Sequence, residues 1–252
     1  MPANRDSSKS LLEMVGIHKW FGRVHALRGV DFAVGRGEVV GLVGDNGAGK
    51  STLIKVASGY HRADEGQTFF EGEEVRISSP RDARALGVET VYQEQALAPD
   101  LSIARNIFMG REPSTTLGFM DKRTMNAESM NALASIGLHL RSPDTPVSTL
   151  SGGQRQGVAI ARVLHFEAKL VILDEPTIAL SVKEVREVLE FVRQLKDKGV
   201  AVVFIAHNLY HVFSVADRIV VLAQGETLVD MPTKETTVDD LSEIIVRGTL
   251  GE

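Results

Sequence analysis

The sequence predicts an α/β protein whose buried strands run parallel. Three short apolar runs contain no charged residue and have the length of strands, namely Val39–Val43, Leu170–Leu173 and Val200–Ala206. Such runs are typical of parallel strands that are covered on both faces. The clearest helix, Ser181–Lys198, lies between the second and third runs, begins with a capping box and carries one apolar stripe. Strands that alternate with helices in this way favour a parallel sheet.

The bulk composition is that of an ordinary globular protein. The chain has 252 residues, of which 43% are hydrophobic and 24% charged, so it suits one large domain or one domain with a sizeable insertion. Its net charge of −5 provides no general attraction to nucleic acid or anionic lipid. The absence of cysteine excludes disulfides, thiolate metal sites and thiol nucleophiles.

The N-terminal residues 1–10 are polar and lack the apolar stretch of a secretory signal, so we expect a mobile tail there. The longest apolar run, Ala201–Ala206, is far shorter than the roughly 20 residues that span a bilayer. We therefore expect a cytoplasmic protein, whose membrane role, if any, comes through a partner.

The first functional motif is a glycine-rich loop directly after the first apolar run. It has the phosphate-loop pattern G-x-x-x-x-G-K-S and consists of Gly44, Asp45, Asn46, Gly47, Ala48, Gly49, Lys50 and Ser51, with Thr52 following. Glycines let backbone N–H groups turn toward phosphate oxygens, and the next helix points its positive end at the same anion. Lys50 can reach the β- and γ-phosphates, and the Ser51 hydroxyl can ligate Mg²⁺. The alternative is a tight strand-to-helix turn without a ligand.

The remaining elements follow from turn residues and periodicity. In the N-terminal half we expect strands within 11–34, a phosphate-loop helix ending near Gly59 and a hairpin turning at Glu71-Gly72. A short helix over Pro80–Leu86 and a strand over Gly87–Gln93 should follow, and then a mainly helical insertion from about 94 to 146. Near the C-terminus we expect a hairpin over Arg218–Asp230 and a helix that is capped by Thr237 and ends near Gly248.

Two further stretches could contact a nucleotide. Trp20 and Phe21 form an aromatic pair ahead of the phosphate loop, which either stacks on a base or belongs to the core. Ser151, Gly152, Gly153 and Gln154 precede a helical run, so they either cap that helix or form a second anion-binding end. A cap accounts for Ser151, whereas Gly-Gly-Gln is a poor helix start unless another group approaches the backbone closely.

Polar residues also follow the second and third parallel strands. Asp174 and Glu175 end one strand and His207 ends the other, at the edge of the sheet where ligands of α/β proteins bind. Asp174 suits a Mg²⁺ shell, usually through water, and Glu175 suits polarising an attacking water. His207 can hydrogen-bond a γ-phosphate or that water. A solvated acidic strand end, or a zinc site at His207 and His211, are the alternatives.

Together these motifs resemble the ATP-binding subunit of an ABC transporter over nearly the whole chain. In that resemblance the phosphate loop matches Walker A, Gln93 the Q-loop, Leu150–Gln154 the LSGGQ signature, Leu170–Glu175 Walker B, and His207 the H-loop. It implies catalytic roles for Glu175, His207 and Gln93, and Mg²⁺ ligation by Ser51, Gln93 and Asp174. Phe21 falls where the family stacks an aromatic ring on adenine.

The resemblance also implies an architecture and partners. Residues 11–252 would form one ABC domain, with a RecA-like P-loop NTPase core over about 11–93 and 166–252, an N-terminal antiparallel β-subdomain and a helical subdomain over about 94–165. Two copies would form a head-to-tail homodimer that sandwiches two ATP molecules, each completed by Ser151–Gln154 of the other copy. The dimer would bind a membrane permease on the cytoplasmic face of the plasma membrane.

Within the family, the chain resembles the carbohydrate-import branch in Glu89–Gln93, Asn106–Glu112 and His207-Asn208. That branch implies monosaccharide uptake with an external sugar-binding protein and no nucleic acid. One departure is Ser181, where the family usually has an aspartate at the end of its D-loop, so this position cannot supply a carboxylate across the dimer. DNA-repair or ribosome-associated ABC ATPases are the alternatives, but no heptads, cysteines, second phosphate loop or basic charge support them.

Overall fold

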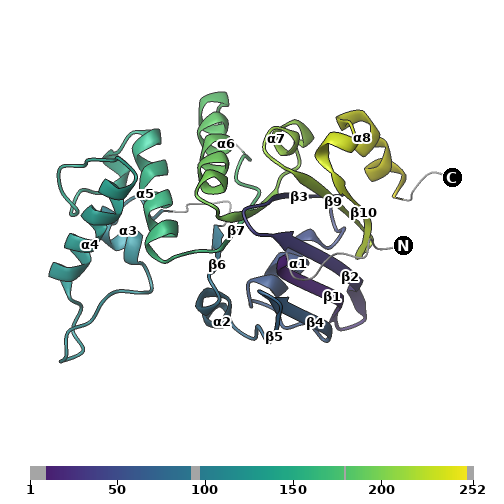
Figure 1. Ribbon diagram of the computed structural model, residues 1–252, viewed down its shortest axis with the longest axis horizontal. Coiled ribbons are helices and arrows are strands. Elements are labelled where there is room, and N and C mark those ends of the chain that lie inside the picture. Colours follow the sequence, from purple (N-terminus) through teal and green to yellow (C-terminus); the bar gives the residue numbers. More distant parts are fainter. Residues whose placement is uncertain (1–9, 92–96, 179, 249–252) are drawn as a thin grey trace.

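The computed structural model describes residues 10–91, 97–178 and 180–248. Its centre is a six-stranded sheet with the order β10-β9-β3-β8-β7-β6 (Figure 1). The strands are β3 (Val39–Val43), β6 (Val88–Val91), β7 (Leu170–Asp174), β8 (Ala201–Ile205), β9 (Arg218–Ala223) and β10 (Glu226–Pro232). All neighbours pair in parallel except β9 and β10, which form the antiparallel hairpin expected over Arg218–Asp230.

A smaller antiparallel sheet has the order β2-β1-β4-β5. Its strands are β1 (Ser10–Phe21), β2 (Val24–Gly35), β4 (Glu65–Phe70) and β5 (Glu73–Val75). The predicted hairpin turn lies between β4 and β5, where Glu71 and Gly72 both have positive φ. Ser10, which we expected in the mobile tail, begins β1; the rest of the predicted tail lies outside the described residues.

Eight α-helices connect the strands of the described chain. They are α1 (Lys50–Ala57), α2 (Pro80–Ala85), α3 (Ile103–Phe108), α4 (Lys122–Ser135), α5 (Gly152–His165), α6 (Val182–Asp197), α7 (Leu209–Phe213) and α8 (Val238–Arg247), with short 3₁₀ turns at Val147–Thr149 and Thr233–Glu235. The sequence prediction missed α7. None of the described helices is long and apolar enough to cross a membrane.

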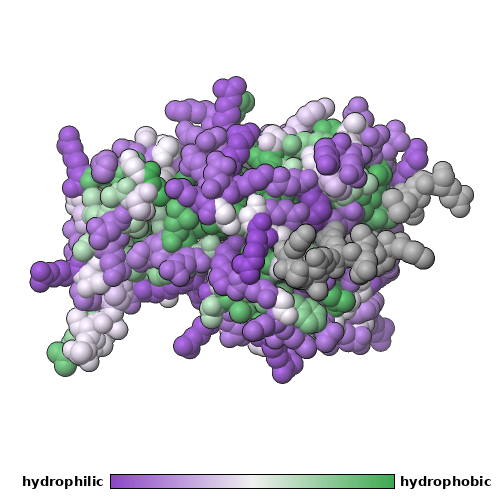
Figure 2. All heavy atoms as spheres, in the orientation of Figure 1, coloured by the Kyte–Doolittle hydropathy of each residue, from purple (hydrophilic) through white to green (hydrophobic). Residues whose placement is uncertain are grey.

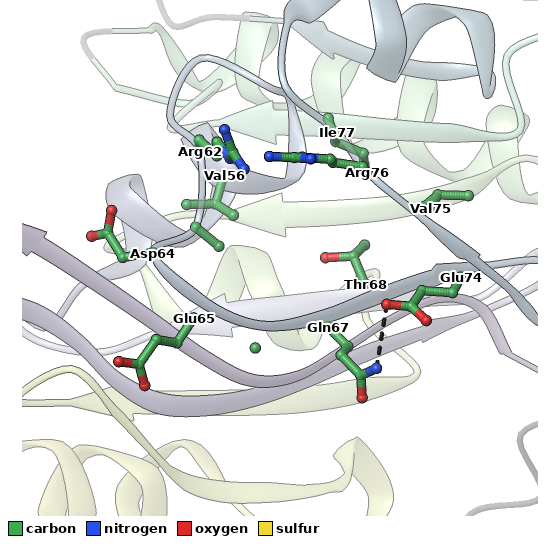
Figure 3. Close-up of a pocket in the computed structure, with 12 residues that line it drawn as sticks. Val56, Arg62, Asp64, Glu65, Gln67, Thr68, Glu74, Val75, Arg76 and Ile77 are labelled. Atoms are coloured by element: carbon green, nitrogen blue, oxygen red, sulfur yellow. Dashed lines mark hydrogen bonds between the residues drawn. The ribbon is translucent and has the colours of Figure 1, made fainter.

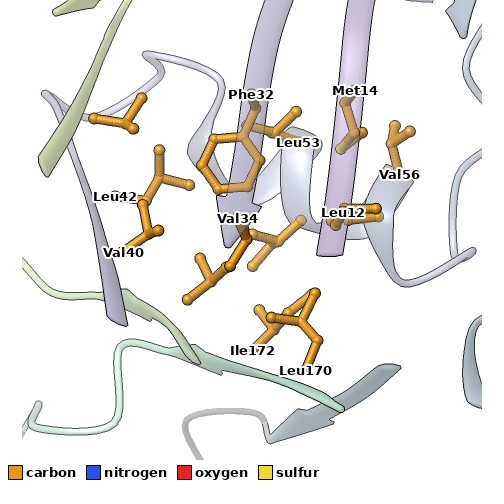
Figure 4. Close-up of a cluster of buried hydrophobic side chains, with 14 of the residues drawn as sticks. Leu12, Met14, Phe32, Val34, Val40, Leu42, Leu53, Val56, Leu170 and Ile172 are labelled. Atoms are coloured by element: carbon orange, nitrogen blue, oxygen red, sulfur yellow. The ribbon is translucent and has the colours of Figure 1, made fainter. Parts of the chain in front are cut away.

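Two hydrophobic cores cover the two faces of the six-stranded sheet. Alternate residues of each strand point to opposite faces, so Val40 and Leu42 of β3 enter one core while Val39 and Val43 enter the other. The first core lies between this sheet, α1 and the antiparallel sheet (Figure 4). The second packs the other face against α5, α6, α7 and α8. Burial on both faces explains why the parallel strands are uninterrupted apolar runs.

A third core lies among α3, α4 and α5, at the left of Figure 1. Helix α5 joins it to the rest, because Val158 and Ala161 enter the third core while Ile160 and Val163 enter the second. The loop between α3 and α4 projects from this group and exposes Leu117 and Phe119 at its apolar tip, whereas most of the visible face is hydrophilic (Figure 2).

A charged cluster fastens the two sheets together near their edges. The guanidinium of Arg218 in β9 donates to Glu38 at 2.7 and 3.0 Å, to Asp230 of β10 at 2.7 Å and to the Ala33 carbonyl of β2 at 2.6 Å. Its side chain is only 12% exposed. These hydrogen bonds raise the pKa of Arg218 against the opposing effect of burial.

Candidate nucleotide-binding site

The phosphate loop is shaped by glycines that no other residue could replace without strain. Gly44 has φ of +144°, and a Cβ there would lie 2.2 Å from the Leu222 carbonyl oxygen of β9. Gly49 has φ of +108° and would bring a Cβ within 3.0 Å of Leu27. Gly47 has φ of +78° but faces open space. The first two glycines therefore let the loop lie against neighbouring strands, and the third keeps its outer side open.

Lys50 is held inside this loop. Its Nζ donates to the Gly44 carbonyl at 2.8 Å and the Asp45 carbonyl at 3.0 Å, and the residue is 6% exposed. Burial lowers the pKa of Lys50, while the charges of Glu175, Asp45 and Asp174 act in the opposite direction. Because the ammonium has carbonyls but no ion-pair partner among the described residues, it can exchange them for phosphate oxygens.

The loop is also tied to the hairpin of β9 and β10, because the Gly225 N–H donates to the Ala48 carbonyl at 3.0 Å. The side chain of Ser51 is exposed at the start of α1, next to Thr52, which is half-buried. Asn46 is exposed, and its N–H donates to the Asp45 carboxylate at 2.7 Å. Gly44–Gly49 therefore form the turn between β3 and α1, and Lys50, Ser51 and Thr52 form the first turn of α1.

Two carboxylates at the end of β7 interact electrostatically with Lys50. Oδ1 of Asp174 and Oε2 of Glu175 are buried without a hydrogen-bond partner among the described residues. Burial raises the pKa of Asp174, and the charges of Lys55 and Lys50 oppose it. Burial also raises the pKa of Glu175, opposed by His207 and Lys50 and reinforced by Asp174. Two buried acceptors without donors make an oxygen-rich site that suits a cation or a water molecule.

Glu175 is fixed from two directions. Its backbone has φ of +55°, and its N–H donates to the Ile205 carbonyl of β8 at 3.0 Å. Its Oε1 lies 2.8 Å from Nε2 of His207. A left-handed conformation is costly for a glutamate, and such strain clusters at functional sites. Nothing in the sequence pattern signalled it.

His207 and His211 do not converge on one metal. Nε2 of His207 contacts Glu175, whereas Nδ1 of His211 lies 3.2 Å from Oγ1 of Thr177 and its Nε2 lies 3.3 Å from Asn208. No group of three His, Cys, Asp or Glu side chains that could hold a metal occurs in the described parts of the chain. The zinc alternative therefore has no support in this arrangement.

Ser151–Gln154 lie at the start of α5, in the helical group, and α1 lies on the far side of β7 from them in Figure 1. Ser151 and Gln154 form a reciprocal capping box, which the sequence reasoning missed. A Cβ on Gly152 would lie 2.4 Å from the Glu187 carboxylate of α6, whereas Gly153 faces open space. The sequence predicted that another group approaches the backbone of these glycines closely. At Gly152 that group is the Glu187 carboxylate, whereas the backbone of Gly153 remains accessible.

Phe21 and Trp20, at the end of β1, have different surroundings. Trp20 stacks on His25 with ring centroids 4.2 Å apart, and His18 continues the stack at 5.3 Å from Trp20. Phe21 is 43% exposed, with the His61 ring edge-on at 5.1 Å. Neither ring is part of the cores, so the interpretation of both as core residues is wrong. Gln93, the remaining predicted site residue, lies outside the described residues.

Comparisons with known proteins agree with this geometry. Residues 27–178 match the family model described as ABC transporter. The chain is 49% identical to the xylose/arabinose import ATP-binding protein XylG of Sulfolobus acidocaldarius, covering 96% of both chains. It is 44% identical to the fructose import ATP-binding protein FrcA of Rhizobium meliloti, covering 93% of both. A ribose import ATP-binding protein of Streptomyces avermitilis is also 44% identical, but the chain spans only 45% of its length.

Solved structures give the same result. The ADP conformation of MJ1267, an ATP-binding cassette of an ABC transporter, superposes with a TM-score of 0.76 at 26% identity, covering 94% of this chain and 95% of that one. The cbiO1 component of the Clostridium perfringens cbiONQ transporter gives a TM-score of 0.74 at 26% identity, covering 95% and 96%. These likenesses confirm the predicted fold class, and the chain belongs to the ABC transporter family as one of its ATP-binding ATPase cassettes.

Proposed function

We propose that the chain is the ATP-hydrolysing subunit of an importer that takes up a monosaccharide through a separate membrane permease. The observation that carries the hydrolytic part is the meeting of Lys50, Asp174, Glu175 and His207 at the end of the parallel strands. The sugar part is supported by the relatives, whose names specify import of xylose or arabinose, fructose and ribose. Identity of 49% over nearly the full length of one of them favours a pentose or a similar sugar.

The phosphates of ATP would bind in the phosphate loop. Lys50 would leave the Gly44 and Asp45 carbonyls and donate to β- and γ-phosphate oxygens, with the loop N–H groups and the start of α1 around them. Transfer of the ammonium to a dianionic phosphate also removes the cost of burying it beside neutral groups. Phe21, exposed at the end of β1, would stack on adenine.

The residues present fit a magnesium ion. The buried Oδ1 of Asp174 accepts no hydrogen bond from the described residues, and the Ser51 hydroxyl lies in the first turn of α1. Oxygen ligands of this kind are those that Mg²⁺ prefers, with water filling the remaining positions. Asp174 would act through a water molecule, and Gln93 is the third proposed ligand. Bound Mg²⁺ would neutralise charge on the phosphates.

Glu175 would orient and deprotonate the attacking water. Burial raises its pKa, so the carboxylate is a stronger base than an exposed one. The His207 contact at 2.8 Å occupies Oε1 and leaves the unpartnered Oε2 for the water. The water oxygen then bonds to the γ-phosphorus while the bond from that phosphorus to the bridging oxygen breaks. The proton passes to Glu175, and ADP and phosphate are released.

Ser151–Gln154 would serve the ATP of a second copy rather than their own. They begin α5 in the helical group, while Lys50 begins α1 between the two sheets. The helix N-terminus and the accessible Gly153 provide N–H donors for a γ-phosphate, and two copies arranged head to tail would give each site both halves. Gln93 would report the γ-phosphate to the permease.

The remaining partners follow from the importer assignment. The ATPase dimer would bind permease subunits at the cytoplasmic face of the membrane, and an external sugar-binding protein would deliver the sugar. A net charge of −5 disfavours nucleic acid as a partner.

Replacing Glu175 by Gln tests the hydrolytic assignment. Steady-state hydrolysis should fall by about 10² to 10⁴, the usual loss for a missing general base, while ATP binding survives. An unaffected rate would remove Glu175 from the mechanism. For transport, a strain lacking this chain should lose uptake of one labelled monosaccharide among xylose, arabinose, ribose and fructose. The wild-type chain should restore that uptake and the Glu175→Gln variant should not; retention of all four activities would overturn the sugar assignment.

A further inference from the structure

A pocket of about 530 Å³ lies between the last turn of α1 and the strands β4 and β5 (Figure 3). Its volume falls in the range of small-molecule sites. The pocket is lined by apolar side chains of α1, β5 and the neighbouring loops and by polar side chains of β4. Val56, Ala63, Val75 and Ile77 form the apolar part, and Gln67 and Thr68 belong to the polar part.

Two arginines converge at one end of this pocket. Arg62 comes from the connection between α1 and β4, and Arg76 follows β5, so the two are 14 positions apart in the sequence. In Figure 3 the two guanidinium groups point toward one another. Both side chains are exposed, and neither has a hydrogen bond or an ion pair with any described residue, whereas Arg36, Arg111 and Arg218 are each paired with a carboxylate. Water weakens the repulsion between these two exposed charges, and an anion bound between them would turn it into attraction.

The acidic side chains of the pocket do not supply that anion. Asp64 is bound to the Lys19 ammonium at 3.0 Å and to the Trp20 N–H at 2.7 Å, and these contacts lower its pKa, the Trp20 bond most. Glu74 accepts from the Gln67 amide at 3.3 Å. Glu65 and Asp64 point away from the guanidinium groups in Figure 3. Neither guanidinium therefore has a carboxylate bound to it among the described residues.

We propose that this pocket binds a phosphate monoester of a small polyhydroxylated molecule. A phosphate monoester carries close to two negative charges and so matches two guanidinium groups, each of which can bind it through two N–H donors, whereas a carboxylate would neutralise only one. The Thr68 hydroxyl, which has no hydrogen-bond partner among the described residues, and the Gln67 and Glu74 side chains accept or donate to hydroxyl groups on the body of the ligand.

This inference does not depend on the proposed function, because the pocket shares no residue with the proposed nucleotide site. It nevertheless touches that site's scaffold. Val56, in the wall of the pocket, belongs to α1, the helix that begins with Lys50. A ligand in the pocket thus rests on the far end of the helix that holds the phosphate loop.

Binding of glucose 6-phosphate to the full chain tests the proposal. Because a phosphate loop can bind phosphates too, the nucleotide site is first saturated with a non-hydrolysable ATP analogue and Mg²⁺. Glucose 6-phosphate should then bind at submillimolar concentration in a titration followed by NMR, and glucose, which lacks the phosphate, should not. Arg62→Gln with Arg76→Gln should weaken binding at least about tenfold, which corresponds to about 1.4 kcal/mol.

Arg123→Gln is the matched control, since it removes the same charge from α4, outside the pocket, and should leave the affinity unchanged. Thr68→Val should weaken glucose 6-phosphate but not inorganic phosphate, because only the former carries hydroxyl groups. An unchanged thermal unfolding midpoint shows that each variant is folded. Absence of binding, equal binding of glucose, or an affinity that the paired arginine variants do not change would overturn the proposal.

Discussion

Nε2 of His207, at the end of β8, lies 2.8 Å from Oε1 of Glu175, at the end of the neighbouring strand β7. The contact joins two side chains that are 32 positions apart in the sequence but lie at the ends of two neighbouring parallel strands. It leaves one carboxylate oxygen of Glu175 occupied and the other buried and free of partners among the described residues. A base with one bound and one available oxygen is oriented before substrate arrives, which lowers the cost of reaching the transition state.

Replacing His207 by Ala should slow ATP hydrolysis by about 10- to 100-fold, because Glu175 loses the group that orients it. The pKa of Glu175 should rise further, because the charge of His207 lowers it in the intact protein. The acidic limb of the pH–rate profile should therefore move to higher pH, measured as kcat between pH 5 and 9. His207→Gln, which retains an N–H donor, should recover part of the rate. An unchanged pH–rate profile in His207→Ala would show that His207 does not influence the pKa of Glu175.

Replacing Asp174 by Asn should stabilise the nucleotide-free protein at neutral pH. Burial raises the pKa of Asp174 above its value in the unfolded chain, so the folded state favours the protonated form. The ionised Asp174 carboxylate therefore does not destabilise the folded protein below the pKa that Asp174 has in the unfolded chain. The destabilisation develops as the pH rises through the higher pKa that it has in the folded protein. We expect a higher unfolding midpoint by about 2 to 4 °C, as for about 1 kcal/mol in a chain of this size.

The same variant should lose most of the added stability that Mg²⁺ with ATP gives the wild type. The difference between variant and wild type should shrink below pH 4, where both carry a neutral group. A lower midpoint for Asp174→Asn at neutral pH would show that the carboxylate is already compensated in the free protein.

Two glycines of the phosphate loop should respond differently to alanine. Gly44→Ala places a Cβ 2.2 Å from the Leu222 carbonyl, so the loop must leave β9, and nucleotide affinity should fall by at least about 100-fold. Gly47→Ala meets nothing within 4 Å and carries only the cost of its positive φ, about 1 kcal/mol. Equilibrium binding of a fluorescent ATP analogue compares the two; equal losses would mean that the Leu222 contact does not shape the loop.

Ser151→Ala should affect activity beyond its effect on the helix. Loss of the capping box should destabilise the protein by about 1 kcal/mol, and Thr237→Ala, which removes the equivalent box at α8, should cost a similar amount. Only Ser151→Ala should reduce the ATPase rate, because Thr237 lies outside the proposed site. Chemical denaturation measures the loss of stability, and steady-state hydrolysis measures the ATPase rate. If Ser151→Ala and Thr237→Ala hydrolyse ATP at the same rate, Ser151 acts only as a helix cap.

Arg218→Met should destabilise the protein by about 3 to 5 kcal/mol, since it leaves the Glu38 and Asp230 carboxylates beside each other without their common cation. Arg218→Lys should restore only part of that loss, because an ammonium cannot reproduce the fork that reaches Glu38, Asp230 and the Ala33 carbonyl together. Urea unfolding gives the free energies of unfolding of the variants. If Arg218→Lys is as stable as the wild type, the forked shape of the guanidinium does not contribute to stability.

The local elements of the fold could be predicted because each has a local cause. Apolar runs gave β3, β7 and β8, and the capping residues Ser181 and Thr237 marked the starts of α6 and α8. Helix α7 has only five residues, too few for periodicity to show. The order of the strands could not be inferred, since parallel neighbours are joined by long crossovers that the residues themselves do not specify.

The site was predictable in its chemistry but not in its geometry. The residue types and spacings of Gly44–Ser51 and of Asp174 with Glu175 indicate phosphate and cation chemistry. The positive φ of Glu175, its contact with His207 and the approach of Glu187 to Gly152 depend on neighbours that are distant in sequence. The arginine pair of the pocket escaped notice for the same reason, because Arg62 and Arg76 meet only once β4 and β5 have paired.

Each proposed ATP site consists of Lys50 from one copy of the chain and Ser151–Gln154 from another. Because the chain has no cysteine, Asn46→Cys and Gly153→Cys can be added as a unique pair, both at accessible positions. In a Glu175→Gln background, a short bis-maleimide should join two chains through these two cysteines when ATP and Mg²⁺ are present, and not when they are absent. A cross-link within one chain, or a yield between chains that ATP does not change, would contradict the shared site.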